Sequence, residues 1–328
     1  MVLLFLLEIR ERLRTLYIEH GKIIKFLGKF ALCLWTFLYI SSVLNYNEKL
    51  SSILLIVGIS LVCSCLPINL LPLLAGVFVL GELSSLSLEI TLVVGLIFVV
   101  MLLIYSIFLP EYMYILVLVP LLFSIKVPYI LPLMLGIIGN LGTIIPLMLG
   151  VFVRYLIVYI AGNATVLVDT NSIGRLEKYM LLINGIIGNS MMFAVIIAFA
   201  LSMIAVMVIS RLTVVYSSVI SVSIGVVIEL IILLGADILG GSFTRTITPL
   251  GVTFGCIISG ILVLIYRTVI YTVDYRRIET VEFEDDDYYY YVKAVPKINV
   301  SKSDMQVKKI VRRKRGQTQD EMDESIEE

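Results

Sequence analysis

Charged residues are scarce in this sequence, and the scarcity is local. Asp, Glu, Lys and Arg make up 15% of the 328 residues, whereas a soluble domain usually carries about 25%. Few charges occur between residues 30 and 266, while both ends of the chain are rich in them. A soluble protein needs charged side chains to cover its surface, but a protein solvated by lipid does not. The pattern therefore excludes an ordinary soluble globular fold.

Residues that bind metals or carry redox chemistry are equally few. Histidine occurs once, as His20, and the four cysteines (Cys33, Cys63, Cys65 and Cys256) lie in apolar stretches. Their spacing matches no zinc or redox motif. We therefore expect neither a metal site nor a cofactor.

Sequence motifs of the common enzyme classes are missing as well. There is no Gly-x-x-x-x-Gly-Lys-Ser/Thr phosphate loop, no Gly-x-Ser-x-Gly elbow and no His-Glu-x-x-His helix. An intramembrane hydrolase would need a paired acid and base, and the apolar region offers few acids and no histidine. We predict that the chain is not an enzyme, which leaves open a role as the membrane partner of a separate ATPase.

Long apolar runs take the place of these features. A run of roughly 18 or more apolar residues can cross a bilayer, and Leu86–Leu109 is such a run. We predict an all-α integral membrane protein with about ten transmembrane helices. The predicted spans are Ile23–Leu44, Ser51–Leu66, Pro67–Glu82, Leu86–Leu109, Tyr112–Ile125, Val127–Asn140, Gly142–Gly162, Ser190–Ile209, Ser217–Leu239 and Pro249–Thr272.

Three of these spans fall short of the roughly 20 residues that cross a bilayer as a straight helix. They are Pro67–Glu82, Tyr112–Ile125 and Val127–Asn140, and two of them contain the prolines Pro72 and Pro132. Such segments predict broken or re-entrant helices. Irregular backbone at membrane depth is tolerated only where protein or a water-filled cavity surrounds it.

The basic residues predict the orientation and the domain boundaries. About six Lys or Arg precede the first span and several follow the last, which predicts that both termini are cytoplasmic. Lys126 falls on the outer side and counts against this scheme. Residues 1–22 read as an amphipathic helix on the membrane surface rather than a secretory signal. Residues 23–272 form the bundle, and residues 273–328 a cytoplasmic tail, partly disordered.

A Leu-Pro-Leu motif occurs twice, in Leu66–Gly76 and in Val127–Gly136. The spans around the two copies, residues 51–109 and 112–162, form units of three spans each. An odd number of spans inverts the second unit in the membrane, which predicts the inverted 3+3 repeat common in secondary transporters. Chance similarity in a leucine-rich chain is the alternative.

Five polar residues inside the bundle are candidates to line a substrate site. Arg154 and Glu229 each lie about twelve residues into spans of the same direction, so we predict that they pair or share an aqueous cavity. A purely scaffolding ion pair is the alternative. Asn69, Asn140 and Thr143 lie near the predicted helix breaks and complete the set.

Three further acids lie near the outer ends of their predicted spans. Glu82, Glu89 and Asp237 are expected to be solvated charges at the edges of loops. The alternative is that they line an outer vestibule.

The tail carries an unusual tyrosine run. After an acidic segment, residues 282–287, the sequence continues with Tyr288, Tyr289, Tyr290 and Tyr291. Tyrosine and valine favour strands, and a lone strand is unstable. The segment at 288–295 therefore needs another part of the tail or a partner chain, which makes these tyrosines candidates for partner binding.

Two parts of the sequence carry a resemblance. The tail segments 273–280 and 283–297, together with Leu66–Gly76, resemble a group of uncharacterised multi-pass membrane proteins of anaerobic Gram-positive bacteria. The resemblance covers most of the chain and implies a bacterial plasma membrane. It implies no activity.

Two functions fit these observations. The first is a transporter or permease component that moves a small solute or ion through a site between the two repeat units. The second is a membrane scaffold or assembly factor that recruits cytoplasmic proteins through its tail. The partners expected are the lipid bilayer, a cytoplasmic protein at the tail and a second copy of the chain. The basic cluster at 308–315 comes with no folded domain that reads nucleic acid, so no nucleic-acid partner is expected.

Overall fold

The chain divides into two compact units, residues 1–271 and 272–328. The structure, a computed structural model, describes the backbone of residues 2–108, 112–168, 175–212, 217–240, 249–271, 279–284 and 289–294. It describes the side chains of residues 20–104, 112–166, 180–212, 217–238 and 249–267. Within these ranges the first unit is built of helices, and the second contributes two strands.

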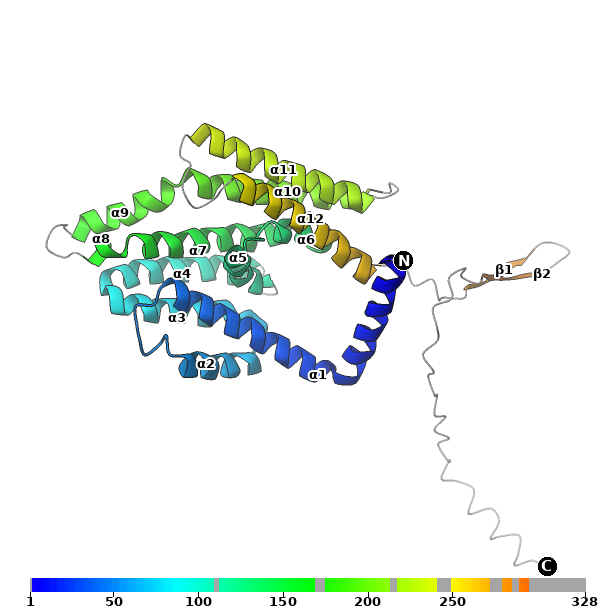
Figure 1. Cartoon of the computed structure of the whole chain (residues 1–328), viewed down its shortest axis with the longest axis horizontal. Helices are drawn as coiled ribbons and strands as arrows, with labels where there is room; N and C mark the ends of the chain where they lie inside the picture. Colours follow the sequence, from blue (N-terminus) through cyan, green and yellow to red (C-terminus); the bar gives the residue numbers. More distant parts are fainter. Residues whose placement is uncertain are drawn as a thin grey trace, which may run out of the picture. The chain divides into compact units, whose positions relative to one another are not determined.

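The helices follow the apolar runs, because lipid offers no partner for a backbone N–H or C=O group and a helix satisfies both internally. Their order along the chain is shown in Figure 1. The helices are α1 (Val2–Val43), α2 (Ile53–Cys65), η1 (Ile68–Leu70), α3 (Leu71–Leu86), α4 (Leu88–Phe108), α5 (Tyr114–Ser124), α6 (Ile130–Ile138), η3 (Leu141–Thr143), α7 (Ile144–Gly162), α8 (Ala164–Val168), α9 (Arg175–Ile187), α10 (Ser190–Ser210), α11 (Ser217–Gly240) and α12 (Pro249–Tyr271).

The lengths of these helices make the chain an all-α integral membrane protein. Among the described residues, six helical segments are long and apolar enough to cross a membrane: His20–Val43, Ile68–Leu86, Leu141–Gly162, Ser190–Ser210, Ser217–Ile238 and Pro249–Arg267. Each corresponds to a predicted span. Helix α4 has 21 residues, whereas α2, α5 and α6 have 13, 11 and 9. The predicted total of about ten spans is therefore not confirmed.

Two prolines do not interrupt helices as the sequence led us to expect. Pro72 lies in the first turn of α3, and Pro132 is the third residue of α6. A proline in the first turn is tolerated because its missing N–H would have no partner there in any case. The span predicted to be short at Pro67–Glu82 extends through η1 and α3 to Leu86. The other two short spans contain helices of only 11 and 9 residues, and their broken or re-entrant course stays a prediction.

Helix α1 is continuous except at His20, whose φ of −121° and ψ of 23° are not helical. Figure 1 shows the resulting bend. The bend lies close to residue 22, where the predicted surface helix ends. The amphipathic character of that helix concerns side chains outside the described ones and stays a prediction.

The buried side chains form two main regions. One gathers residues of α1 to α4 with a few of α9 and the start of α10, and it is called here the first group. The other gathers residues of α6, α10, α11 and α12, called here the second group. Helices α5 and α7 contribute to both: on α7, Leu147 and Val151 pack with the second group, while Leu156 and Ile160 pack with the first. These two helices therefore form the contact between the groups.

The packing does not confirm the inverted repeat. The predicted second unit, residues 112–162, is divided, because α6 packs against α10 and α12 while α5 packs against α7. In the predicted first unit, α3 packs against α4 and α2 packs against α1. The helices that the motif aligns, α3 and α6, also differ in length, with 16 and 9 residues.

The tail unit contains an antiparallel hairpin. Strand β1 (Glu279–Glu284) pairs with β2 (Tyr289–Ala294), in a register that sets Glu282 opposite Tyr291. The predicted strand thus finds its partner in the preceding segment of the same tail. The predicted disorder at the end of the tail lies outside the described residues.

Glu82 departs most clearly from its expected role as a solvated charge. Its side chain is fully buried. Oε2 accepts hydrogen bonds from the backbone N–H groups of Tyr46 and Asn47, at 2.9 and 3.0 Å, and Oε1 accepts one from the Ser51 hydroxyl at 3.1 Å. Burial, and then the neighbouring Glu82, raise the pKa of the Tyr46 phenol above its usual value. Glu82 therefore ties the α1–α2 loop to α3, and the expectation of a solvated charge is wrong for this residue.

We expect the Glu82→Ala variant to lose about 2 kcal/mol of stability, because it leaves buried backbone N–H groups without an acceptor. The measurement is the melting temperature of the purified chain in detergent. The exposed Glu48 in the same loop provides the matched control, Glu48→Ala. Equal melting temperatures for the two variants would contradict the role given to Glu82.

Candidate functional site

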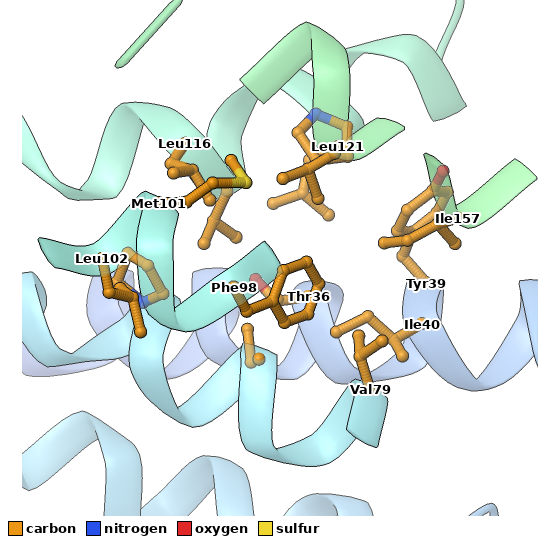
Figure 2. Close-up of a pocket in the computed structure, with 16 residues that line it drawn as sticks. Thr36, Tyr39, Ile40, Val79, Phe98, Met101, Leu102, Leu116, Leu121 and Ile157 are labelled. Carbon is orange, nitrogen blue, oxygen red and sulfur yellow. The ribbon is translucent and has the colours of Figure 1, made fainter. Parts of the chain in front are cut away.

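An apolar cavity lies where the first group meets α5 and α7. Its volume is about 60 Å³, and its walls come from α1, α3, α4, α5 and α7. Figure 2 shows Phe98, Thr36, Ile40 and Met101 around it, with Tyr39 beside Ile157 at one end. The cavity thus lies between α3 and α4 of the predicted first repeat unit and α5 and α7 of the second.

The helical spacing of small and apolar residues creates this space. On α3 the wall is formed by Pro72, Ala75, Gly76 and Val79, which are three or four residues apart and so lie on one face. Ala75 and Gly76 fill little volume. A Cβ added at Gly76 would meet the ring of Phe98 at 3.4 Å, across the cavity.

Two polar side chains line the cavity, and only one of them has a hydrogen-bond partner. The hydroxyl of Thr36 donates to the carbonyl of Leu32 one turn earlier, at 2.7 Å. The hydroxyl of Tyr39 is buried and has no hydrogen-bond partner. A buried hydroxyl without a hydrogen-bond partner costs free energy. Tyr39 therefore marks the end of the cavity at which a polar ligand could supply that partner.

Arg154 lies at this same end of the cavity. It follows the lining residue Val153 on α7 and lies close enough to Tyr39 to act on it electrostatically. Its guanidinium carbon is 5.8 Å from the centre of the Phe123 ring, a cation–π contact. Its Nε is buried without a hydrogen-bond partner, as is the hydroxyl of the neighbouring Tyr155.

Glu229 occupies a separate polar site in the second group. It lies on α11, is fully buried, and its Oε1 accepts a hydrogen bond from Ser202 on α10 at 3.0 Å. Its Oε2 has no partner. Cys256 on α12 and Tyr129 at the start of α6 lie within electrostatic range of it.

The predicted ion pair between Arg154 and Glu229 is absent. One oxygen of Glu229 bonds to Ser202 and the other has no partner, so neither contacts the guanidinium. The two helices carry these residues at similar positions, but α7 turns Arg154 towards α1 and α5, while α11 turns Glu229 towards α10 and α12. Two residues at the same depth in the membrane are in contact only if their side chains also face each other.

A row of aromatic rings separates the two sites. Phe123 contacts Tyr155 with ring centres 6.4 Å apart and Phe199 at 6.3 Å, and Phe199 contacts Tyr129 at 6.1 Å. The row extends from the cation–π contact of Arg154 to the surroundings of Glu229. The two sites are therefore connected through packed rings. The shared aqueous cavity stays a prediction.

The other predicted lining residues lie apart from the cavity. Asn69 is a partly buried residue of η1, and Asn140 is exposed just before η3. Thr143 is fully buried, and its hydroxyl donates to the carbonyl of Asn140 at 2.7 Å. These three residues lie in or next to the short 3-10 helices, and none of them lines the cavity.

The tail tyrosines are described only in part. Tyr289, Tyr290 and Tyr291 belong to β2, and Tyr288 lies outside the described residues. Within the hairpin, Tyr289 is opposite Glu284 and Tyr290 is opposite Phe283. Their role in partner binding stays a prediction.

The sequence interpretation missed Tyr39, Tyr155 and Ser202. Tyrosine and serine are common in membrane spans, so neither residue type stands out in a hydropathy pattern. A signal was nevertheless present at Tyr155, which directly follows the only Arg in its span.

Comparisons with protein-family models, with curated proteins and with solved structures find no match to this chain.

Proposed function

We propose that this chain is a transporter or permease component of a bacterial plasma membrane, with both termini in the cytoplasm, and that it moves a small solute through the region between α3–α4 and α5–α7. One observation carries the proposal. A partly buried cationic side chain, Arg154, lies beside a cavity bounded by both predicted units, and no described carboxylate pairs with it. Unpaired ionisable groups inside membrane proteins mark substrate or ion pathways, because their cost is otherwise not offset.

Cysteine accessibility in whole cells tests this proposal. Single cysteines replace Arg154, Thr36 and Leu92 on a background without the four native cysteines, and a membrane-impermeant thiol reagent is added. We expect labelling at positions 154 and 36, because a transport pathway must admit water in at least one conformation. Leu92 is 74% exposed on α4 and faces lipid, so it should remain unlabelled.

Loop positions provide the controls for orientation. Cysteines at Asn47 and Arg211, which lie between helices, should be labelled from opposite sides if the predicted topology holds. Labelling at position 47 in intact cells and at position 211 in permeabilised cells, with none at 154 or 36 in either, would mean a dry bundle and would overturn the transport proposal.

A scaffold function is the second candidate, and the hairpin favours it. A sheet of two strands has two edges with unpaired backbone groups, and an extended peptide of a partner can add to such an edge. Deleting residues 288–328 removes β2 and leaves the helices intact. We expect a transporter to keep its accessibility pattern and its function after this deletion, whereas a scaffold would lose the recruited protein and the associated phenotype.

A further inference from the structure

No anion lies beside Arg154 in the part of the chain that the structure describes. An unpaired charge at the centre of a bilayer is strongly disfavoured, and arginine remains charged at any ordinary pH. Among the described residues, its neighbours are the face of the Phe123 ring and the phenol groups of Tyr39 and Tyr155, none of which is an anion. A ring face offers only weak attraction, so the guanidinium still lacks a counter-ion.

The groups around it are all able to donate hydrogen bonds. Tyr39 is 9% exposed and its hydroxyl has no partner, and the hydroxyl of Tyr155 and the Nε of Arg154 are in the same state. An arginine can only donate, and a tyrosine hydroxyl donates readily. Three buried groups that can donate, one of them part of a cation and none of them next to a described anion, are suited to an acceptor that carries negative charge.

The adjoining cavity indicates the size and polarity of the part of the ligand that does not contact Arg154. Its walls are apolar apart from Thr36, whose hydroxyl is already bonded, and Tyr39. Its volume of about 60 Å³ is well below the roughly 150 Å³ that accommodates benzene. The space therefore suits a short alkyl group and excludes an aromatic ring.

We propose that Arg154, Tyr39 and Tyr155 bind the carboxylate of a short-chain aliphatic acid whose alkyl group enters the cavity. A single cation matches a single negative charge, which favours a monocarboxylate over a phosphate ester with two charges. The planar guanidinium fits a carboxylate with two parallel hydrogen bonds. The inference that such an acid is a substrate rests on the proposed function. Its binding can be measured without measuring transport.

Thermal unfolding of the purified full chain tests the binding. The probes are the sodium salts of acetate, propionate, butyrate, pentanoate and hexanoate, each compared with the alcohol of equal chain length and with sodium chloride. We expect saturable stabilisation by the acids, with an affinity that rises about fourfold per methylene group. The rise should stop once the alkyl group exceeds the cavity. The alcohols should bind at least tenfold more weakly.

Variants test the binding of the carboxylate and the binding of the alkyl group separately. Arg154→Gln should abolish the preference for acids over alcohols, and Tyr39→Phe should weaken acid binding several-fold. Gly76→Leu fills the cavity, so it should retain acetate binding and lose the gain from longer chains. Gly58→Leu is the matched control, because nothing lies within 4 Å of a Cβ at that glycine. If Arg154→Gln fails to fold, Tyr39→Phe and Gly76→Leu still decide the question.

The possible results are distinct. Equal stabilisation by acids, alcohols and chloride, or full chain-length dependence in Gly76→Leu, would overturn the carboxylate site. If the acids fail to bind while position 154 is labelled in cells, transport stands and the ligand class is wrong. If the acids bind while position 154 is never labelled, the binding site stands and the transport proposal is wrong.

Discussion

A Gly136→Leu variant is expected to lose the packing of α6 against α10. A Cβ at Gly136 would lie 2.6 Å from Cβ of Val206, 2.7 Å from its Cγ1 and 3.0 Å from the carbonyl oxygen of Met203. Val206 is β-branched and fully buried, and the carbonyl belongs to a helix backbone, so neither can move aside without shifting α10. Overpacking of this kind costs about 1–3 kcal/mol or more, and the larger leucine should reach the upper end.

The measurement is thermal unfolding in detergent, together with size-exclusion chromatography. We expect the melting temperature to fall by about 6 °C or more, or the monodisperse peak to disappear. The control, Gly235→Leu on α11, adds the same side chain where nothing lies within 4 Å of the Cβ. If Gly136→Leu and Gly235→Leu had the same melting temperature, α6 and α10 could not approach each other as closely as the contacts of Gly136 indicate.

The helices themselves could be predicted where an apolar run is long and uninterrupted. Helix α10 occupies Ser190–Ser210 and α11 occupies Ser217–Gly240, within one residue of the predicted boundaries. A long apolar segment has one favourable conformation in lipid, so the local sequence decides its structure. The short helices α5 and α6 follow less directly, because segments of 11 and 9 residues depend on neighbouring helices for cover.

The candidate site could be predicted only in part. Arg154 was identified because a charge within an apolar run is conspicuous, but its neighbours Tyr39 and Phe123 come from other helices. A helix that is apolar on every side gives no periodic signal for the face that it turns inward. Glu82 shows the same limit: its position near a span end indicated solvent, while its three hydrogen bonds to the α1–α2 loop depend on tertiary contacts.

A Glu229→Lys variant is expected to destabilise the second group strongly. The carboxyl group is fully buried among α10, α11 and α12, with Ser202 on Oε1 and no cation of the described side chains beside it. A buried ionisable group in such a place is tolerated only where its hydrogen bonds are satisfied or its charge is paired. A lysine would bring an unpaired positive charge, which costs at least about 2.5–3.5 kcal/mol inside a membrane. The melting temperature should fall by about 5 °C or more, with lower yield from the membrane fraction.

Glu229→Gln distinguishes the need for shape from the need for charge. Glutamine keeps the size of the side chain and an acceptor for the Ser202 hydroxyl, so this variant should melt within about 2 °C of the native chain. Asp237→Lys, on a partly buried residue of the same helix, is the control for adding a lysine to α11 and should cost less than Glu229→Lys. Should Glu229→Gln prove as damaging as Glu229→Lys, the negative charge itself would be required. A cation, taken up from outside the described residues, would then have to occupy the space beside Oε2.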